Sequence, residues 1–201
     1  MKVLILGIDG YLGWALALRL VRRGHEVIGI DNFYTRKAVN EVGSDSALPI
    51  LSMQDRIRAV EEIFGARIEF IEGDATNYDL VRKVIERYRP DTIVHFAEQR
   101  SAPYSMIDVE HAKYTIINNL TSTLNVIYAV REVRRDIHIL KMGTWVSMAI
   151  QHLGYPRMRL LMPLSRGLGI GLSCPGGLAH GITGVRCLIH TCSYTQINCG
   201  A

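Results

Sequence analysis

Apolar residues in the first 144 positions recur with two spacings, and the two patterns alternate along the chain. Short runs rich in β-branched residues predict strands that are buried on both faces, at 2–6, 25–31, 67–74, 91–98 and 137–144. Longer segments with apolar positions three and four apart predict helices, at 14–24, 52–65, 77–88 and 114–133. This alternation predicts an α/β fold with a Rossmann-type, doubly wound parallel sheet of about five strands.

The turn after the first predicted strand reads GIDGYLG and holds three glycines. Gly7 permits a tight turn, Gly10 lets the backbone approach a pyrophosphate, and Gly13 lets the next helix pack close to the sheet. Asp31 ends the second predicted strand and can accept hydrogen bonds from a ribose diol. Its charge would repel a 2′-phosphate, so NAD is favoured over NADP. These positions predict a dinucleotide site; the alternative is a glycine-rich turn in an unrelated α/β protein.

The carboxyl ends of the predicted strands are the places where such a sheet binds its ligands. Because parallel strands end at one edge of the sheet, the residues that follow each strand should lie together. In this sequence they are Gly7–Gly13, Asp31, Asp74, Phe96–Arg100 and Gly143–Thr144.

Composition changes abruptly at Thr144. All 19 acidic residues precede this position, whereas all four cysteines and half of the 18 glycines follow it. The net charge of +4 therefore arises in the last 57 residues and does not indicate a partner such as nucleic acid. We expect an incomplete nucleotide-binding domain at 1–144 and an irregular, poorly ordered tail at 145–201. No cysteine lies in the first part, which favours the cytoplasm, and no signal peptide or membrane span is legible.

Several motifs resemble the extended short-chain dehydrogenases/reductases, the NAD-dependent nucleotide-sugar epimerases and dehydratases. They are the GxxGxxG spacing, GD after the third predicted strand and VHFAE after the fourth. Within that family, HFAEQRSAPYSMID at 95–108 and NNLTSTLNV at 118–126 resemble the UDP-sulfoquinovose synthases, as do GIDGYLGWA and the DN at 31–32. The resemblance covers residues 1–144 almost continuously. It implies a tightly held NAD, UDP-glucose and sulfite as substrates, a link to sulfolipid, and allows a homodimer.

The resemblance also implies roles for individual residues. It assigns the cofactor to Gly7, Gly10, Tyr11, Leu12, Gly13, Asp31, Asn32, Tyr34, Thr35, Arg36, Asp74, Ala75, Phe96, Ala97, Glu98 and Asn118. It assigns the sugar and sulfonate side to Gln99, Arg100, Ser101 and Thr144, with Thr144 as the catalytic residue that hydrogen-bonds the sugar 4-hydroxyl.

Three side chains can be judged on chemistry alone. A planar guanidinium suits bidentate binding of an oxyanion, which favours Arg100; the alternative is a surface salt bridge. His95 lies inside an apolar strand and is predicted to be a core histidine rather than an acid or base. Trp14 is predicted to pack between helix and sheet rather than to stack on a ligand.

The tyrosine and lysine that this family uses for proton transfer, in a YxxxK pattern, occur nowhere in the chain. Without that pair the chain has no legible means of deprotonating a sugar hydroxyl, so we expect it to be inactive as written. The tail offers no zinc site of standard spacing, and no metal is expected.

Loss of one nucleotide at the Thr144 codon would account for the change of composition. With that base restored, the Trp145–Val146 and Met148–Ala149 codon pairs force glycines, and the text can continue as MGEYG, as it does in this family. The same frame across Ala179–Cys187 permits SWYHWSKV, which puts a tyrosine at the position of Ile182 and a lysine at that of Arg186. Only the glycines are forced; the other residues are permitted.

Three hypotheses remain open. The first is a frameshifted nucleotide-binding part of a UDP-sulfoquinovose synthase. The second is another NAD-dependent nucleotide-sugar epimerase or dehydratase. The third is a non-catalytic NAD(H)-binding module with a genuine tail. The nucleotide sequence around codon 144 would separate the first from the third.

Overall fold

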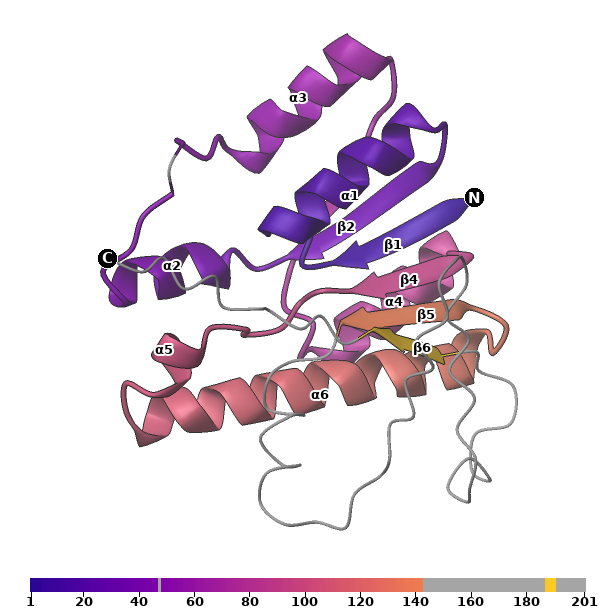
Figure 1. Ribbon diagram of the computed structural model, residues 1–201. Helices are drawn as coiled ribbons and strands as arrows, with labels where there is room; N and C mark the ends of the chain where they lie inside the picture. Colours follow the sequence, from indigo (N-terminus) through magenta and orange to yellow (C-terminus); the bar gives the residue numbers. More distant parts are fainter. Residues whose placement is uncertain (47, 143–186, 191–201) are drawn as a thin grey trace, which may run out of the picture.

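The computed structural model describes residues 1–46, 48–142 and 187–190, and within them six parallel strands form one sheet in the order β3-β2-β1-β4-β5-β6 (Figure 1). The strands are β1 (Lys2–Leu6), β2 (Glu26–Asp31), β3 (Glu69–Glu72), β4 (Thr92–His95), β5 (His138–Met142) and β6 (Cys187–His190). The helices are α1 (Tyr11–Arg22), α2 (Tyr34–Glu41), α3 (Met53–Phe64), α4 (Tyr78–Tyr88), α5 (Ala102–Ser105) and α6 (Val109–Val133).

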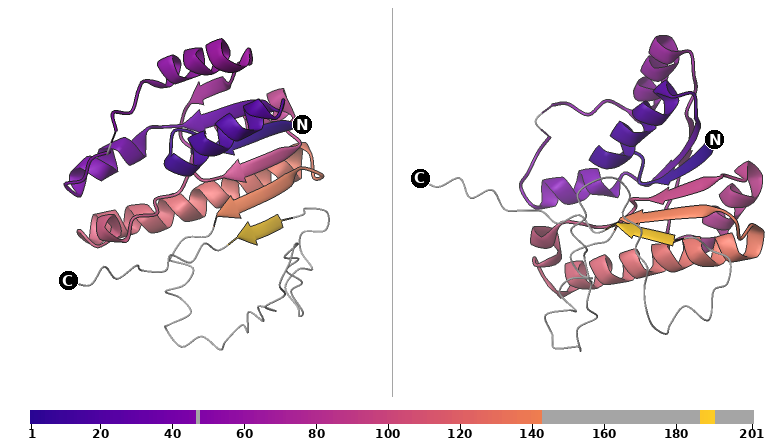
Figure 2. Two further views of the ribbon diagram at one scale, coloured as in Figure 1. Left: turned by 45° about the horizontal axis from the view of Figure 1, so that its top comes forward. Right: turned by 45° about the vertical axis from the view of Figure 1, so that its right-hand side comes forward.

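Helices cover both faces of the sheet, as the sequence predicts. Leu4 and Leu6 of β1 pack in one hydrophobic cluster with α4 and α6, whereas Val3 and Ile5 pack in a second cluster with α1 and α3. Successive side chains of a strand point to opposite faces, so both sets can be buried at once. The two helical layers are visible on either side of the sheet in Figure 2. The chain order reverses between β1 and β4, which opens the crevice of a doubly wound fold.

Side-chain caps account for where several helices begin and end. The Ser52 hydroxyl accepts from the Asp55 N–H at 3.1 Å at the start of α3, and Gly65 ends that helix with a φ of 62°. The Asn77 side chain caps α4 in the same way. Both predicted helices are confirmed. The Asp108 carboxylate caps α6, so this helix begins at Val109 rather than near 114.

Three elements were not expected from the sequence. Helix α2 begins after Phe33 without a side-chain cap, and α5 is a four-residue helix that contains a proline. Five strands were predicted and are confirmed, and β6 adds a sixth along the outer edge of β5, with Ile139 opposite Cys187. An edge strand presents unpaired N–H and C=O groups, so an extended segment can add to it.

Thr144 and most of the tail lie outside the described residues. The expected disorder of 145–201 and the division of the chain at Thr144 therefore stay predictions. Within the described ranges no helix is both long and apolar enough to span a bilayer.

Candidate functional site

The glycine turn lies at the crevice, between the carboxyl end of β1 and α1. The Gly7 N–H donates to the Ile30 carbonyl at 2.8 Å and Gly7 has a φ of 84°. A Cβ on Gly7 would lie 2.7 Å from the Phe96 carbonyl carbon, and one on Gly13 would lie 2.1 Å from the Gly7 oxygen. Gly10 precedes α1 and supplies no side-chain cap. The first N–H groups of α1 thus remain available to an anion, as a pyrophosphate requires.

Asp31 holds the turn from the end of β2. Its two carboxylate oxygens accept from the Asp9 and Phe33 N–H groups, both at 2.8 Å. Burial raises the pKa of the Asp31 carboxyl, while these two backbone hydrogen bonds oppose the rise. Each oxygen can accept more than one bond, so the carboxylate can still take ribose hydroxyls.

A pocket that is open to solvent runs along the carboxyl ends of β2, β1 and β4. It brings together fifteen of the predicted residues: Gly7, Gly10, Asp31, Asn32, Tyr34, Thr35, Asp74, Ala75, Phe96, Ala97, Glu98, Gln99, Arg100, Ser101 and Asn118. Leu12 and Gly13 line a smaller adjoining pocket, which Met142 also lines. Tyr11 is 81% exposed, Arg36 lies against Asp9 instead, and Thr144 lies outside the described residues.

Asn32 and Asp74 tie together the ends of β2 and β3. The Asn32 amide donates to Asp74 at 2.8 Å, and the other Asp74 oxygen accepts from the Thr76 N–H and hydroxyl, each at 2.7 Å. The Asn32 side-chain oxygen accepts from the Tyr34 N–H at 3.0 Å. This network fixes one end of the pocket as a rigid polar wall.

The loop after β4 is fastened to α6 by buried amides. Asn119 accepts from the Gln99 N–H at 2.8 Å and donates to the Gln99 carbonyl at 2.9 Å. The Gln99 side chain donates to Thr115 at 2.9 Å and accepts from the Ser101 N–H at 2.6 Å. Gln99 and Ser101 thus shape the loop, and the exposed Arg100 between them reaches the pocket. Within the part of the chain that the structure describes, Arg100 forms no ion pair, so the salt-bridge alternative finds no partner there.

Glu98 and Lys141 form a buried ion pair at the other end of the pocket. Burial raises the pKa of the Glu98 carboxyl, and the Lys141 cation opposes the rise. His95, opposite Lys141 in the sheet, is 1% exposed with both ring nitrogens unpartnered. Burial and the Lys141 charge lower its pKa to about 3. His95 is a neutral core residue at ordinary pH, as predicted.

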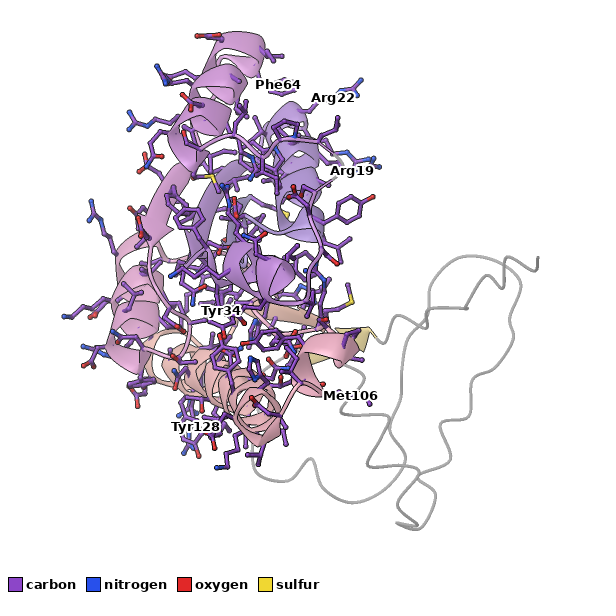
Figure 3. All side chains as sticks on the ribbon, turned by 90° about the vertical axis from the view of Figure 1, so that its left-hand side faces the viewer. Arg19, Arg22, Tyr34, Phe64, Met106 and Tyr128 are labelled. Atoms are coloured by element: carbon purple, nitrogen blue, oxygen red, sulfur yellow. The ribbon has the colours of Figure 1, made fainter. Side chains whose placement is uncertain are left out.

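Sequence reasoning missed an aromatic group that joins α2 to α6. The Tyr34 and Tyr114 rings stack with centroids 4.4 Å apart, and the Tyr34 hydroxyl hydrogen-bonds that of Tyr104. Tyr34 is labelled in Figure 3. Tyr114 lines the pocket, as do the apolar Ala38, Val39 and Val42. The only sequence signal was the helical spacing of these three apolar residues, two of them in α2 and Val42 at its C-cap. Trp14 packs against the core with the Arg56 guanidinium 3.9 Å above its ring, which confirms its packing role.

These groups fit a dinucleotide. They are the uncapped start of α1 at the glycine turn, the Asp31 carboxylate at the end of the neighbouring strand, and the apolar lining of the pocket. No cluster of three metal-ligating side chains occurs among the residues described.

Comparison with known proteins agrees with this geometry. The model of the NAD dependent epimerase/dehydratase family matches residues 3–149. The chain is 62% identical over 144 residues to a UDP-sulfoquinovose synthase of Sulfolobus acidocaldarius and 42% identical over 143 residues to the chloroplastic one of Spinacia oleracea. These matches cover 72% and 71% of this chain but only 37% and 30% of the relatives. The chain therefore matches about a third of the length of these relatives.

More distant relatives extend the likeness. A UDP-glucose 4-epimerase of Klebsiella pneumoniae is 30% identical over 131 residues, which are 65% of this chain and 81% of that protein. The UDP-glucose 4-epimerase of Bifidobacterium longum, solved with NAD⁺ and UDP, superposes with a TM-score of 0.55 at 23% identity, covering 71% of this chain and 37% of that one. At this identity the superposition establishes the shared fold alone.

Proposed function

Because the chain belongs to the NAD dependent epimerase/dehydratase family, we propose that its described part is the NAD-binding portion of an enzyme that makes UDP-sulfoquinovose from UDP-glucose and sulfite. The observation that supports this most is the 62% identity over 144 residues to a UDP-sulfoquinovose synthase. The K. pneumoniae relative keeps open another nucleotide-sugar epimerase or dehydratase activity.

The reaction would proceed through a ketone. A hydride and a proton leave C4 and its hydroxyl, and the ketone acidifies the proton on C5. Loss of that proton and of the C6 hydroxyl as water gives an alkene, to which sulfite adds through sulfur at C6 while C5 regains a proton. Return of the hydride and a proton restores the C4 alcohol, and the net change is UDP-glucose plus sulfite to UDP-sulfoquinovose plus water. Bound NAD supplies the acceptor and donor of the hydride.

Residues of this chain have distinct tasks in that scheme. The turn from Gly7 to Gly13, with Tyr11 and Leu12, would hold the pyrophosphate, and Asp31 and Asn32 the adenosine ribose. Tyr34, Thr35 and Arg36 would lie along the adenosine side, and Asp74 and Ala75 would face adenine. Phe96, Ala97 and Glu98 would flank the nicotinamide half, and Asn118 would contact the cofactor. The sugar and sulfonate side would be bound by Gln99, Arg100, Ser101 and Thr144.

Arg100 is the best placed of these to bind an oxyanion. It extends from a loop fixed by the Gln99 and Asn119 amides, so its backbone is held in place before any ligand arrives. Its guanidinium lies 4.0 Å from the position of a Cβ on Gly10, close to where a pyrophosphate would lie. This side chain can therefore attract an oxyanion, either a diphosphate or sulfite.

Catalysis itself would fail in the chain as written, because no YxxxK pair is present to take the proton from the sugar hydroxyl. We propose that the residues after Thr144 are translated from a shifted reading frame. The family model ends at residue 149, close to the change of composition, which supports it. One observation favours a genuine tail and a non-catalytic NAD(H)-binding module: β6, at 187–190, pairs with β5.

A homodimer is part of the proposal. Exposed apolar side chains follow one stripe of α6, and Figure 3 shows Tyr128 on its outer side: Ile116, Ile117, Leu120, Leu124 and Tyr128. A stripe of this kind suits contact with a second copy. A cytoplasmic location is proposed from the lack of cysteine in residues 1–144.

The test compares two genes: the present one, and one with a single base restored at codon 144 and read through in that frame. We expect the restored product to convert UDP-glucose only when sulfite is present, and the present chain to be inactive. Conversion of UDP-glucose without sulfite would favour an epimerase or dehydratase. Activity of the 201-residue chain would overturn the inactivity proposal.

A further inference from the structure

Asp9, in the middle of the glycine turn, forms ion pairs with two arginines, Arg36 and Arg56. Its carboxylate oxygens receive Nε and Nη2 of Arg36 from α2, each at 2.7 Å, and Nη1 of Arg56 from α3, also at 2.7 Å. The Asp9 side chain is only 6% exposed, and that of Arg56 only 12%. The Arg56 guanidinium also lies on the Trp14 ring. Both cations are therefore held in fixed positions beside the turn.

This cluster adjoins the carboxylate that would bind the adenosine ribose. The Asp9 N–H donates directly to Asp31 at 2.8 Å. Tyr34 and Thr35 line the pocket, but the next residue, Arg36, turns away from it to reach Asp9. Both guanidiniums are thus directed at Asp9, whose own N–H is bonded to Asp31, the carboxylate that would hold the ribose.

Guanidinium groups are the side chains best suited to a phosphate, which they bind bidentately. Left unpaired, Arg36 and Arg56 could bind the 2′-phosphate that distinguishes NADP from NAD. We propose that Asp9 is a specificity-determining residue, which favours NAD over NADP by engaging both arginines and by adding its own negative charge. The inference rests on the proposed NAD-binding function and adds a second determinant to Asp31.

The test measures the dissociation constants of NAD⁺ and NADP⁺ for the 201-residue chain by titration calorimetry. In Asp9→Asn the carboxylate charge is lost and the arginines are released. We expect NADP⁺ affinity to rise about tenfold or more relative to NAD⁺. In Asp9→Asn/Arg36→Ala most of that gain should disappear. Asp136→Asn removes the same charge from an exposed aspartate paired with Arg134 and should leave the ratio unchanged.

A second variant keeps Asp9 and so covers a failure of Asp9→Asn to fold. Arg36→Gln leaves the Asp9 charge less compensated, so the affinity for NADP⁺ relative to NAD⁺ should fall further. If wild type binds NAD⁺ and neither Asp9→Asn nor Arg36→Gln changes the ratio, Asp9 is a structural tie only and the inference is overturned. If wild type binds neither dinucleotide, the proposed function fails, and the inference fails with it.

Discussion

Of the three glycines in the turn, Gly13 leaves the least room for an added Cβ. An added Cβ would stand 2.1 Å from the Gly7 oxygen and 2.8 Å from the Ile8 Cα, and neither atom belongs to a side chain that could rotate away. Gly13→Ala should therefore push α1 off the turn and lower the free energy of unfolding by about 1–3 kcal/mol or more. NAD⁺ affinity should fall with it, because the first turn of α1 would move. Chemical denaturation and calorimetry measure the two effects.

Gly43 provides the matched control. Gly43 has a positive φ of 67°, which Gly13 does not, and a Cβ there would meet nothing within 4 Å. Gly43→Ala should cost only the backbone strain, about 1–2 kcal/mol, and leave NAD⁺ affinity unchanged. Equal loss of NAD⁺ affinity in the two variants would refute the steric account of the turn.

His95 should make the fold sensitive to acid. The folded chain keeps this ring neutral down to a pKa of about 3, against an ordinary value of 6.5. Between these two values the unfolded chain binds more protons, so the free energy of unfolding falls as the pH is lowered from 6.5 towards 3. The slope from this single group is at most about 1.4 kcal/mol per pH unit.

His95→Leu removes the titrating ring and keeps an apolar side chain in the core. The variant should lose less stability than wild type between pH 6 and pH 4, as measured by urea unfolding at each pH. Parallel curves for the two proteins would show that His95 does not titrate in this window.

At the scale of elements, the loop after β4 depends on α6 for its shape. Asn119 exchanges two hydrogen bonds with the Gln99 backbone and is 9% exposed. Asn119→Ala would leave a buried N–H and C=O unpaired, at a cost of about 1–3 kcal/mol. Arg100 would lose its fixed position, so UDP-glucose should bind more weakly than it does to wild type.

Thr123→Ala is the control for that prediction, because the Thr123 hydroxyl bonds only the Asn119 carbonyl within the same helix. Calorimetric titration of both variants with UDP-glucose makes the comparison. Weakening by Thr123→Ala to the same degree would mean that α6 packing, and not the Asn119 clamp, fixes the loop.

Elements with strong periodic signals were predictable from the sequence, and weak ones were not. The local sequence indicates β1 and β2 through their apolar runs, and α3 through its capping residues Ser52 and Gly65. Helix α2 has no side-chain cap; it is held by contacts that are distant in sequence, such as Arg36 with Asp9 and Tyr34 with Tyr114. Such contacts leave no local pattern. For the same reason the sequence indicated Asp31 and Arg100, but could not reveal Asp9 as the partner of two arginines.

For the whole molecule, the strand order follows from the alternation of strands and helices, since right-handed crossovers leave few arrangements. The sheet then gathers residues from Gly7 to Asn118 at one edge. The residues that transfer protons would have to be encoded after codon 144. The coding DNA should show a lost base near codon 144; a confirmed frame in independent clones would instead support a genuine tail.

The binding of NAD⁺ by the 201-residue chain tests the central claim most directly, because it needs only the residues that form the crevice. Titration calorimetry should show one NAD⁺ per chain for wild type. For Asp31→Ala, checked as folded by circular dichroism, it should show an affinity at least about tenfold lower, since two ribose hydroxyls lose their acceptor. No binding by the folded wild-type chain, or equal binding by Asp31→Ala, would contradict the account.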